Sequence, residues 1–189
     1  MKKLLIRCFL MVVLFLPVSL YVAQAQEFMV GGGAGIGDGY TYYRVESGIP
    51  AVFLRGSYLF TGFLEGSVSS TLFIPNKDYL DDEEGDRRTL VWTLDFDAHY
   101  IFTNYRKQWS FYALAGLNIN FLSSKYLGKE RFPNDYTDNY LGANAGIGSG
   151  YMVGENTKLI AEMKYTLGKF HQWSLTIGVL YTLDGIFGK

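Results

Sequence analysis

The sequence predicts an all-β fold, an eight-stranded antiparallel up-and-down transmembrane β-barrel. Three observations support this prediction. Apolar and polar residues alternate in eight segments of roughly ten residues, the connections between segments are short and long in turn, and aromatic residues gather near the segment ends. A period of two is typical of a strand with one apolar face. Roughly ten residues is the length that a tilted membrane-spanning strand requires.

The first 25 residues have the features of a cleaved secretory signal peptide. Three basic residues open the chain, an apolar run extends from Cys8 to Val22, and Ala23-Gln24-Ala25 is a small-x-small cleavage site. A transmembrane helix is the alternative, but it needs roughly 20 predominantly apolar residues, and this run is shorter. We therefore expect residues 1–25 to be removed and residues 26–189 to form a single outer-membrane β-barrel domain.

Removal of that segment changes the formal net charge from −1 to −4, because it takes away three basic residues and no acidic ones. The remaining chain has no general basic character, which argues against a nucleic-acid partner. Cys8, the only cysteine, lies within the removed segment. The mature chain is therefore expected to have no thiol chemistry and no disulfide.

The alternation is longest between residues 89 and 102, where Leu, Trp, Phe, Ala and Tyr alternate with Thr, Val, Asp and His. A soluble lipocalin-like barrel would alternate as well, with its apolar face lining a cavity and its polar face in water. Here the polar face is rich in Gly, Ser, Thr and Asn, whereas a water-exposed face would carry more Lys and Glu. Small polar residues suit the crowded interior of an eight-stranded barrel, so the sequence favours the membrane barrel.

The predicted connections alternate in length along the chain. Three are short, and four are longer or more polar; the short ones are at 61–62, 103–108 and 154–156, and the others at 38–50, 73–86, 123–139 and 168–172. Bacterial barrels have short periplasmic turns and longer extracellular loops. We therefore predict the outer membrane of a Gram-negative bacterium, with both mature termini in the periplasm because the strand number is even.

Aromatic residues are predicted to form two girdles at the membrane interfaces, where amphipathic rings are favoured. The lower girdle would contain Tyr58, Phe60, Tyr100, Phe102, Trp109, Phe111, Tyr151 and Tyr181. The upper girdle would contain Phe73, Trp92, Phe121, Tyr140, Tyr165 and Trp173. A soluble core gives no reason to sort aromatic residues by strand end.

Charged residues fall on the predicted inner face. They are Arg55, Glu65, Asp95, Asp97, His99, Lys158, Glu162 and Lys164. Unpaired buried charge is costly, so we expect these side chains to pair across the lumen as a structural charge network. The alternative is a narrow ion or proton path along the carboxylates, for which a filled eight-stranded barrel leaves little room.

Two other segments are distinctive. The glycine cluster 31–37 contains no G-x-G-x-x-G motif and precedes no helical pattern, so it does not predict a nucleotide-binding loop. We interpret the glycines as small residues that leave room for bulky side chains in the lumen and let the barrel wall bend.

The acidic segment 78–86 lacks the regular ligand spacing of a calcium loop, so we interpret it as a solvated outer loop. The weaker alternative is that it shares divalent cations with lipopolysaccharide. Lys125, Lys129 and Arg131 could contact lipid phosphates. No motif predicts a cofactor or a metal site.

The last predicted strand carries the most specific motif. Residues 176–183, Thr-Ile-Gly-Val-Leu-Tyr-Thr-Leu, follow the order polar-x-Gly-x-x-apolar-x-apolar. In this the chain resembles the small outer-membrane barrels of the OmpX and OmpA-transmembrane-domain family, although residues 184–189 extend beyond the usual end. The resemblance covers the whole mature chain. It implies an assembly signal at Thr176, Gly178, Tyr181 and Leu183, and as partners the assembly machinery, outer-membrane lipids and lipopolysaccharide.

The sequence does not favour an enzyme. Only His99 and His171 could serve as the base for a serine nucleophile. Some small barrels modify lipid A, but the family pattern of histidine and serine two apart on one strand is absent. We therefore predict a monomeric barrel with a structural or interaction role, in envelope integrity or in binding an extracellular ligand through its loops. A small porin-like channel is the alternative, and a lipid A-modifying enzyme is the least favoured.

Overall fold

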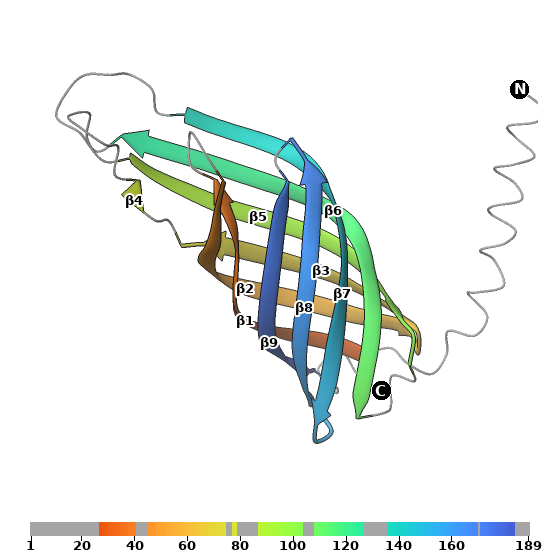
Figure 1. Cartoon of the computed structure of the whole chain (residues 1–189). Coiled ribbons are helices and arrows are strands. Elements are labelled where there is room, and N and C mark those ends of the chain that lie inside the picture. The colour runs from red at the N-terminus through yellow and green to blue at the C-terminus, as the bar shows by residue number, and fades with distance from the viewer. Residues whose placement is uncertain are drawn as a thin grey trace, which may run out of the picture.

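The structure is a computed structural model, and it describes residues 27–40, 45–74, 77–78, 87–103, 108–126, 136–169 and 171–183. These residues form strands joined by turns, with no helix among them (Figure 1). The strands are β1 (Glu27–Tyr40), β2 (Val45–Thr61), β3 (Leu64–Phe73), β4 (Lys77–Asp78), β5 (Arg87–Ile101), β6 (Trp109–Tyr126), β7 (Tyr136–Val153), β8 (Thr157–Gly168) and β9 (Gln172–Thr182).

Eight of these strands close into an antiparallel barrel. Each long strand pairs with the next, β3 pairs with β5, and β1 pairs with β9 to complete the ring. The two-residue strand β4 pairs only with β5. The predicted fold class is therefore confirmed, with β4 as a short addition to the edge of β5.

The two described ends of the chain meet at one end of the barrel, where the Leu183 amide donates a hydrogen bond of 2.8 Å to the Phe28 carbonyl. The same end carries short connections, including the turn at Gly154, whose φ of 77° suits glycine. At the opposite end the stretches 74–86, which includes β4, and 127–135 are long, but the connections 41–44 and 169–171 are shorter than 102–108 at the end with the termini. The predicted alternation of connection lengths is therefore confirmed only in part.

Two of the predicted loops are longer than the connections that the structure has in their place. The predicted loop 38–50 is mostly strand, since β1 extends to Tyr40 and β2 begins at Val45. The predicted loop 123–139 is shortened in the same way, because β6 extends to Tyr126 and β7 begins at Tyr136. On β6 and β7 the outward positions of these strand ends are polar, at Ser123, Lys125, Thr137 and Asn139, so apolar alternation does not extend to them.

Three strands rise past the rest of the barrel at this end (Figure 1). Strand β3 ends where Phe73 pairs with Val91, and β8 ends where Gly168 pairs with Gly142. Beyond these pairs, β6 continues to pair with both β5 and β7, as far as Tyr126 and Ser124 respectively. The barrel therefore carries a sheet extension made of residues 87–90, 122–126 and 136–141.

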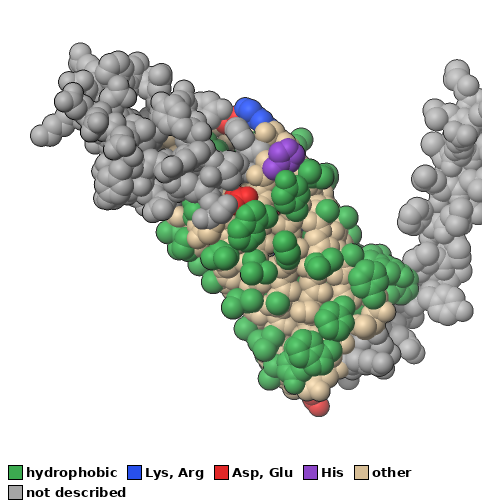
Figure 2. Space-filling model, viewed as in Figure 1, with side chains coloured by type: hydrophobic (Ala, Val, Ile, Leu, Met, Phe, Trp, Pro, Cys, Tyr) green, Lys and Arg blue, Asp and Glu red, His purple; other side chains and the backbone are tan. Residues whose placement is uncertain are grey.

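Apolar side chains face outward on every long strand. On β2, Leu54 is 72 % exposed and the adjacent Arg55 is 5 % exposed. Figure 2 shows hydrophobic side chains over most of the described surface in that view, with the few charged side chains near its ends. The barrel is thus apolar outside and polar inside, the opposite of a lipocalin-like barrel.

The aromatic girdles are only partly as predicted. The lower group faces outward, with side chains that are exposed or half-buried, and Trp92, Phe121, Tyr165 and Trp173 of the upper group do the same. The prediction is wrong for Phe73 and Tyr140, which are 4 % and 8 % exposed and lie on the inner face. Both lie an even number of residues from inward polar residues of the same strand, a relationship called strand parity below. Alternation therefore predicts the inner face for both, and their position near a strand end did not make them girdle residues.

The glycines of β1 let two strands approach closely. A Cβ atom at Gly33 would lie 2.0 Å from the Ile177 carbonyl oxygen on β9, and one at Gly31 would lie 1.9 Å from the Val179 oxygen. The Phe53 ring of β2 reaches beneath β1 to Gly178 of β9, where it would lie 2.7 Å from an added Cβ. The glycines therefore make room for Phe53 in the lumen.

Candidate functional site: the lumen charge network

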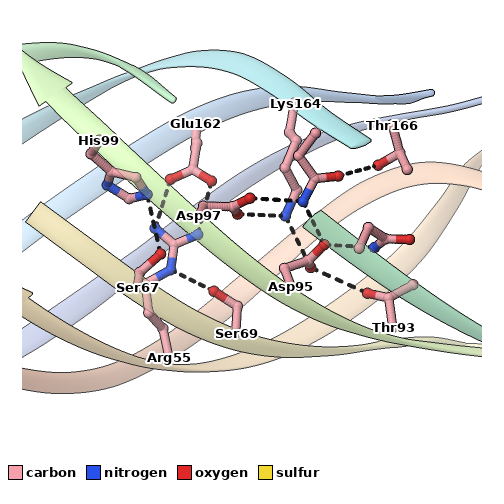
Figure 3. Close-up of polar contacts among 12 residues, drawn as sticks. Arg55, Ser67, Ser69, Thr93, Asp95, Asp97, His99, Glu162, Lys164 and Thr166 are labelled. Carbon is pink, nitrogen blue, oxygen red and sulfur yellow. Dashed lines mark hydrogen bonds and ion pairs between the residues drawn. The ribbon is translucent and has the colours of Figure 1, made fainter. Parts of the chain in front are cut away.

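The first group in the lumen joins β2 to β8. The Arg55 guanidinium donates to both Glu162 carboxylate oxygens, at 2.6 and 2.8 Å, and its Nε donates to Ser69 Oγ at 2.8 Å (Figure 3). The Tyr112 hydroxyl also donates to Glu162, at 3.1 Å. The guanidinium lies 5.5 Å from the Phe53 ring centroid. A bidentate geometry with all partners buried is the strong form of this ion pair.

The second group lies toward the end of the barrel where the chain termini meet. Glu65 accepts a hydrogen bond of 2.9 Å from Lys158 Nζ, and its other oxygen is 3.4 Å from His99 Nδ1. His99 Nε2 is 3.1 Å from Ser67 Oγ. The His99 ring stacks on Tyr112 with centroids 4.9 Å apart. Because Tyr112 also bonds Glu162, it links this group to the first.

The third group contains two carboxylates of β5. Lys164 Nζ lies 2.9 Å from Asp95 and 3.4 Å from Asp97 (Figure 3). The Asn144 amide donates to both carboxylates at 2.8 Å, and Asn118 donates to Asp95 at 2.6 Å. Each carboxylate thus has a cationic and an amide partner, which offsets the cost of burying it.

Apolar clusters lie on both sides of the polar groups. At the loop end the cluster is Ile49, Ala51, Phe73, Val91 and Leu122. At the other end one cluster is Leu59, Ile101, Tyr112 and Leu114, and beside it lies another of Met29, Phe53, Ile160 and Leu180. The described lumen cavity, beside Arg55 and Lys164, measures about 20 Å³. That space holds about one water molecule.

All eight charged residues singled out from the sequence lie in these three groups. Strand parity did not single out their uncharged partners, which are Ser67, Ser69, Tyr112, Asn118 and Asn144. They occupy inward positions on the same strands, so parity combined with hydrogen-bonding capacity is the signal that could have found them.

Glu65, His99 and Ser67 have the connectivity of a catalytic triad, a relationship that the sequence did not suggest. His99 lies between the Glu65 carboxylate and the Ser67 hydroxyl. Catalytic triads are recognised by the geometry of the three side chains, so this arrangement raises the question of a serine-dependent enzyme. Here all three side chains are buried in the lumen, and Lys158 also binds Glu65. The low exposure of Ser67 and His99, 6 % and 1 %, argues against a bulky acyl substrate reaching the serine.

The residues of the suggested assembly signal lie on β9 or just after it. Thr176 pairs with Gly35 and Gly178 with Gly33, in the seam that closes the barrel. Tyr181 faces outward and is exposed, and Leu183 follows the strand. Their role in assembly stays a prediction.

Several sequence predictions fall outside the described residues. These are the signal peptide at 1–25, Lys129 and Arg131, and the acidic segment apart from Asp78, which lies in β4. Within the described residues, no cluster of three or more His, Cys, Asp or Glu residues could hold a metal ion. No helix in the described part of the chain is long and apolar enough to cross a membrane.

Solved barrels share this architecture. The N-terminal β-barrel domain of Pseudomonas aeruginosa OprF matches with a TM-score of 0.60 and 18% identity, over 85% of this chain and 100% of that one. Neisserial surface protein A matches with a TM-score of 0.62 and 18% identity, over 82% and 96%. Ail, the attachment invasion locus protein of Yersinia pestis, matches with a TM-score of 0.59 and 12% identity, over 85% and 100%.

No protein-family model and no curated protein matches the sequence. At these identities the likeness to solved structures concerns the fold. The chain therefore has the fold of the small eight-stranded outer-membrane β-barrels, the class that its last strand and its alternating segments predicted.

Proposed function

We propose that the protein is an integral outer-membrane barrel whose role is structural or interactive, with a closed, non-catalytic lumen. The apolar outer surface supports membrane insertion, and the shared fold supports the outer membrane of a Gram-negative bacterium as its location. With eight strands in the barrel, both mature termini lie in the periplasm. The observation that carries the proposal is the ion-paired lumen between apolar clusters, because it fills the path that a channel would need.

The sheet extension at residues 87–90, 122–126 and 136–141 supports an interaction role. It continues the barrel wall beyond the rim at the end that carries the longer connections. A rigid sheet presents neighbouring loops in fixed positions, and binding residues are often found on loops held by such scaffolds. Ail, which shares the fold, is named for attachment and invasion. We propose by analogy that this end binds an extracellular partner.

Planar-bilayer conductance tests the closed lumen. The purified barrel should give no steady channels, since about one water molecule fits in the described cavity. A Leu59→Ala, Leu114→Ala double variant removes apolar bulk from the cluster nearest the termini and is reconstituted in parallel as the matched control. Steady channels from the unmodified barrel would support the small-pore alternative and overturn our proposal.

Serine-directed labelling tests the catalytic alternative raised by Glu65, His99 and Ser67. A fluorophosphonate probe should leave Ser67 unlabelled in the folded barrel, because the serine is buried with its histidine. The Ser67→Ala variant is the control for background labelling. Labelling of Ser67, together with a change in lipid A mass that depends on Ser67, would show an enzyme.

Export and assembly are tested in the producing cell. We propose that residues 1–25 are cleaved, that Thr176, Gly178, Tyr181 and Leu183 form the signal for the assembly machinery, and that the barrel is monomeric. Mass spectrometry should find Gln26 at the mature N-terminus. Tyr181→Ala should reduce the heat-modifiable form in the outer-membrane fraction, whereas Tyr165→Ala, another exposed tyrosine, should not. Recovery in the soluble periplasm would contradict the membrane location.

A further inference from the structure

The lumen cavity lies between the first and the third of the polar groups described above. It measures about 20 Å³ and is lined by a cation of each group, Arg55 of the first and Lys164 of the third. Among the described residues, no hydrogen bond or ion pair joins these two groups. Tyr112, by contrast, connects the first group to the second. The cavity is therefore located where the described network is interrupted.

Several polar groups on the wall of this cavity lack a partner within the described part of the chain. The wall includes the hydroxyls of Thr71 on β3 and of Ser174 and Thr176 on β9, and none of these makes a hydrogen bond with a described residue. Thr71 and Ser174 are only 7 % and 9 % exposed. Arg55 and Lys164 also have more N–H groups than their described contacts use. Because buried polar groups in native proteins are nearly always hydrogen-bonded, the cavity requires an occupant that both accepts and donates.

The charges on the wall decide between water and a small ion. Two carboxylates, of Asp95 and Glu162, line the cavity together with the two cations, so the wall is formally neutral. An anion would meet the carboxylates, and a cation would meet Arg55 and Lys164. Burying an ion costs far more free energy than immobilising a water molecule, so a neutral occupant is favoured. The volume fits one water molecule.

We propose that this cavity binds one water molecule, which accepts hydrogen bonds from Arg55 and Lys164 and donates to hydroxyl oxygens of Thr71 and the β9 residues. Since the cavity is about one water molecule wide, its occupant contacts the wall on all sides. The water joins the first group to the third, so the polar side chains of the lumen act as a single network. This inference does not depend on the proposed membrane location or on an extracellular partner.

Water–protein NOE spectra of the full-length barrel test the site, with threonine methyls labelled and the detergent deuterated. We expect long-lived water contacts at the methyls of Thr71 and Thr176. Ser174→Val fills the cavity and removes a hydroxyl, so both contacts should disappear. Its unfolding equilibrium constant in urea should rise about tenfold, because two buried cations lose an acceptor. Ser149→Val, the same change on the outward face of β7, is the matched control and should keep both contacts.

A double-mutant cycle separates a shared water from two independent hydroxyl effects. Thr71 and Ser174 lie on β3 and β9, which are not neighbouring strands. Thr71→Val removes a hydroxyl at constant side-chain shape, so it should fold, weaken the water contact at Thr176 and raise the unfolding constant about fivefold. With Ser174→Val added, the loss should stay close to the larger single loss, since both changes act on the same water.

Four outcomes would overturn the proposal. They are the absence of long-lived water contacts at Thr71 and Thr176 in the unmodified barrel, contacts that persist in Ser174→Val, additive losses in the cycle, and a melting temperature that rises saturably with chloride but not with acetate at equal ionic strength. The last result would show a small-anion site in place of the water. None of these results depends on conductance or serine labelling, so the proposed function is tested separately.

Discussion

The Arg55 guanidinium on β2 donates two hydrogen bonds, of 2.6 and 2.8 Å, to the Glu162 carboxylate on β8. These strands are not neighbours, because β1 and β9 lie between them. The ion pair therefore spans the seam between the first and last strands. It connects the two parts of the wall from inside, where water does not compete for the charges.

Removing either partner of this pair should destabilise the barrel strongly. Arg55→Leu or Glu162→Leu leaves one buried charge without its partner, which costs about 3–5 kcal/mol. The double variant leaves neither charge, so its loss should be well below the sum of the single losses. Urea unfolding in lipid vesicles measures all four proteins. Additive losses would show that the two residues do not act as a pair.

Glu65→Leu should lower the heat resistance of the barrel in detergent. The change leaves Lys158 buried without the carboxylate that it contacts at 2.9 Å, and it also removes the partner of His99 Nδ1. The temperature at which gel mobility changes to that of the unfolded form reports the effect. Glu155→Leu, in an exposed turn, is the control and should change stability by less than about 0.5 kcal/mol. An unchanged temperature for Glu65→Leu would count against the network.

Gly33→Ala should destabilise the closing seam. The added Cβ would lie 2.0 Å from the Ile177 carbonyl oxygen, so β1 and β9 would have to move apart. Overpacking of this kind costs about 1–3 kcal/mol. Gly62→Ala is the matched control, since no atom lies within 4 Å of its added Cβ. If both variants unfold at the same urea concentration, the close approach of β1 and β9 has no energetic role.

Strand parity explains how much of the fold the sequence could predict. Residues such as Leu54 and Arg55 differ so strongly in polarity that their opposite faces followed from alternation. Parity also placed the charged residues in the lumen. The same rule places Phe73 and Tyr140 on the inner face, where the structure has them, although both lie near strand ends, where aromatic residues often belong to a girdle. Most of the sheet extension did not follow from alternation, because beyond Leu90 and Leu141 its described outward residues, such as Ser123, Lys125 and Thr137, are polar.

Contacts across the lumen could not be predicted from the sequence. Arg55 and Glu162 are 107 residues apart, and their contact depends on the stagger of all the strands between them. The same holds for Lys158 and Glu65, which are 93 residues apart. The near-equal numbers of acidic and basic residues on the inner face indicated that each charge has a partner of opposite sign. Which residue is the partner depends on the register in which the strands pair. The triad-like order of Glu65, His99 and Ser67 is a further result of that register.

Leu54→Arg tests the membrane location directly. Leu54 is 72 % exposed in the isolated chain, so in a water-soluble protein an arginine there would change stability little. If the outward face lies in hydrocarbon, the same change should cost about 2–4 kcal/mol, because Leu54 lies near the middle of the apolar band on β2. Urea unfolding in lipid vesicles measures the loss. Thr137→Arg, at an exposed position on β7 beyond the band, is the control and should cost less than about 1 kcal/mol. Equal, small losses for both variants would place the outer face of the barrel in water.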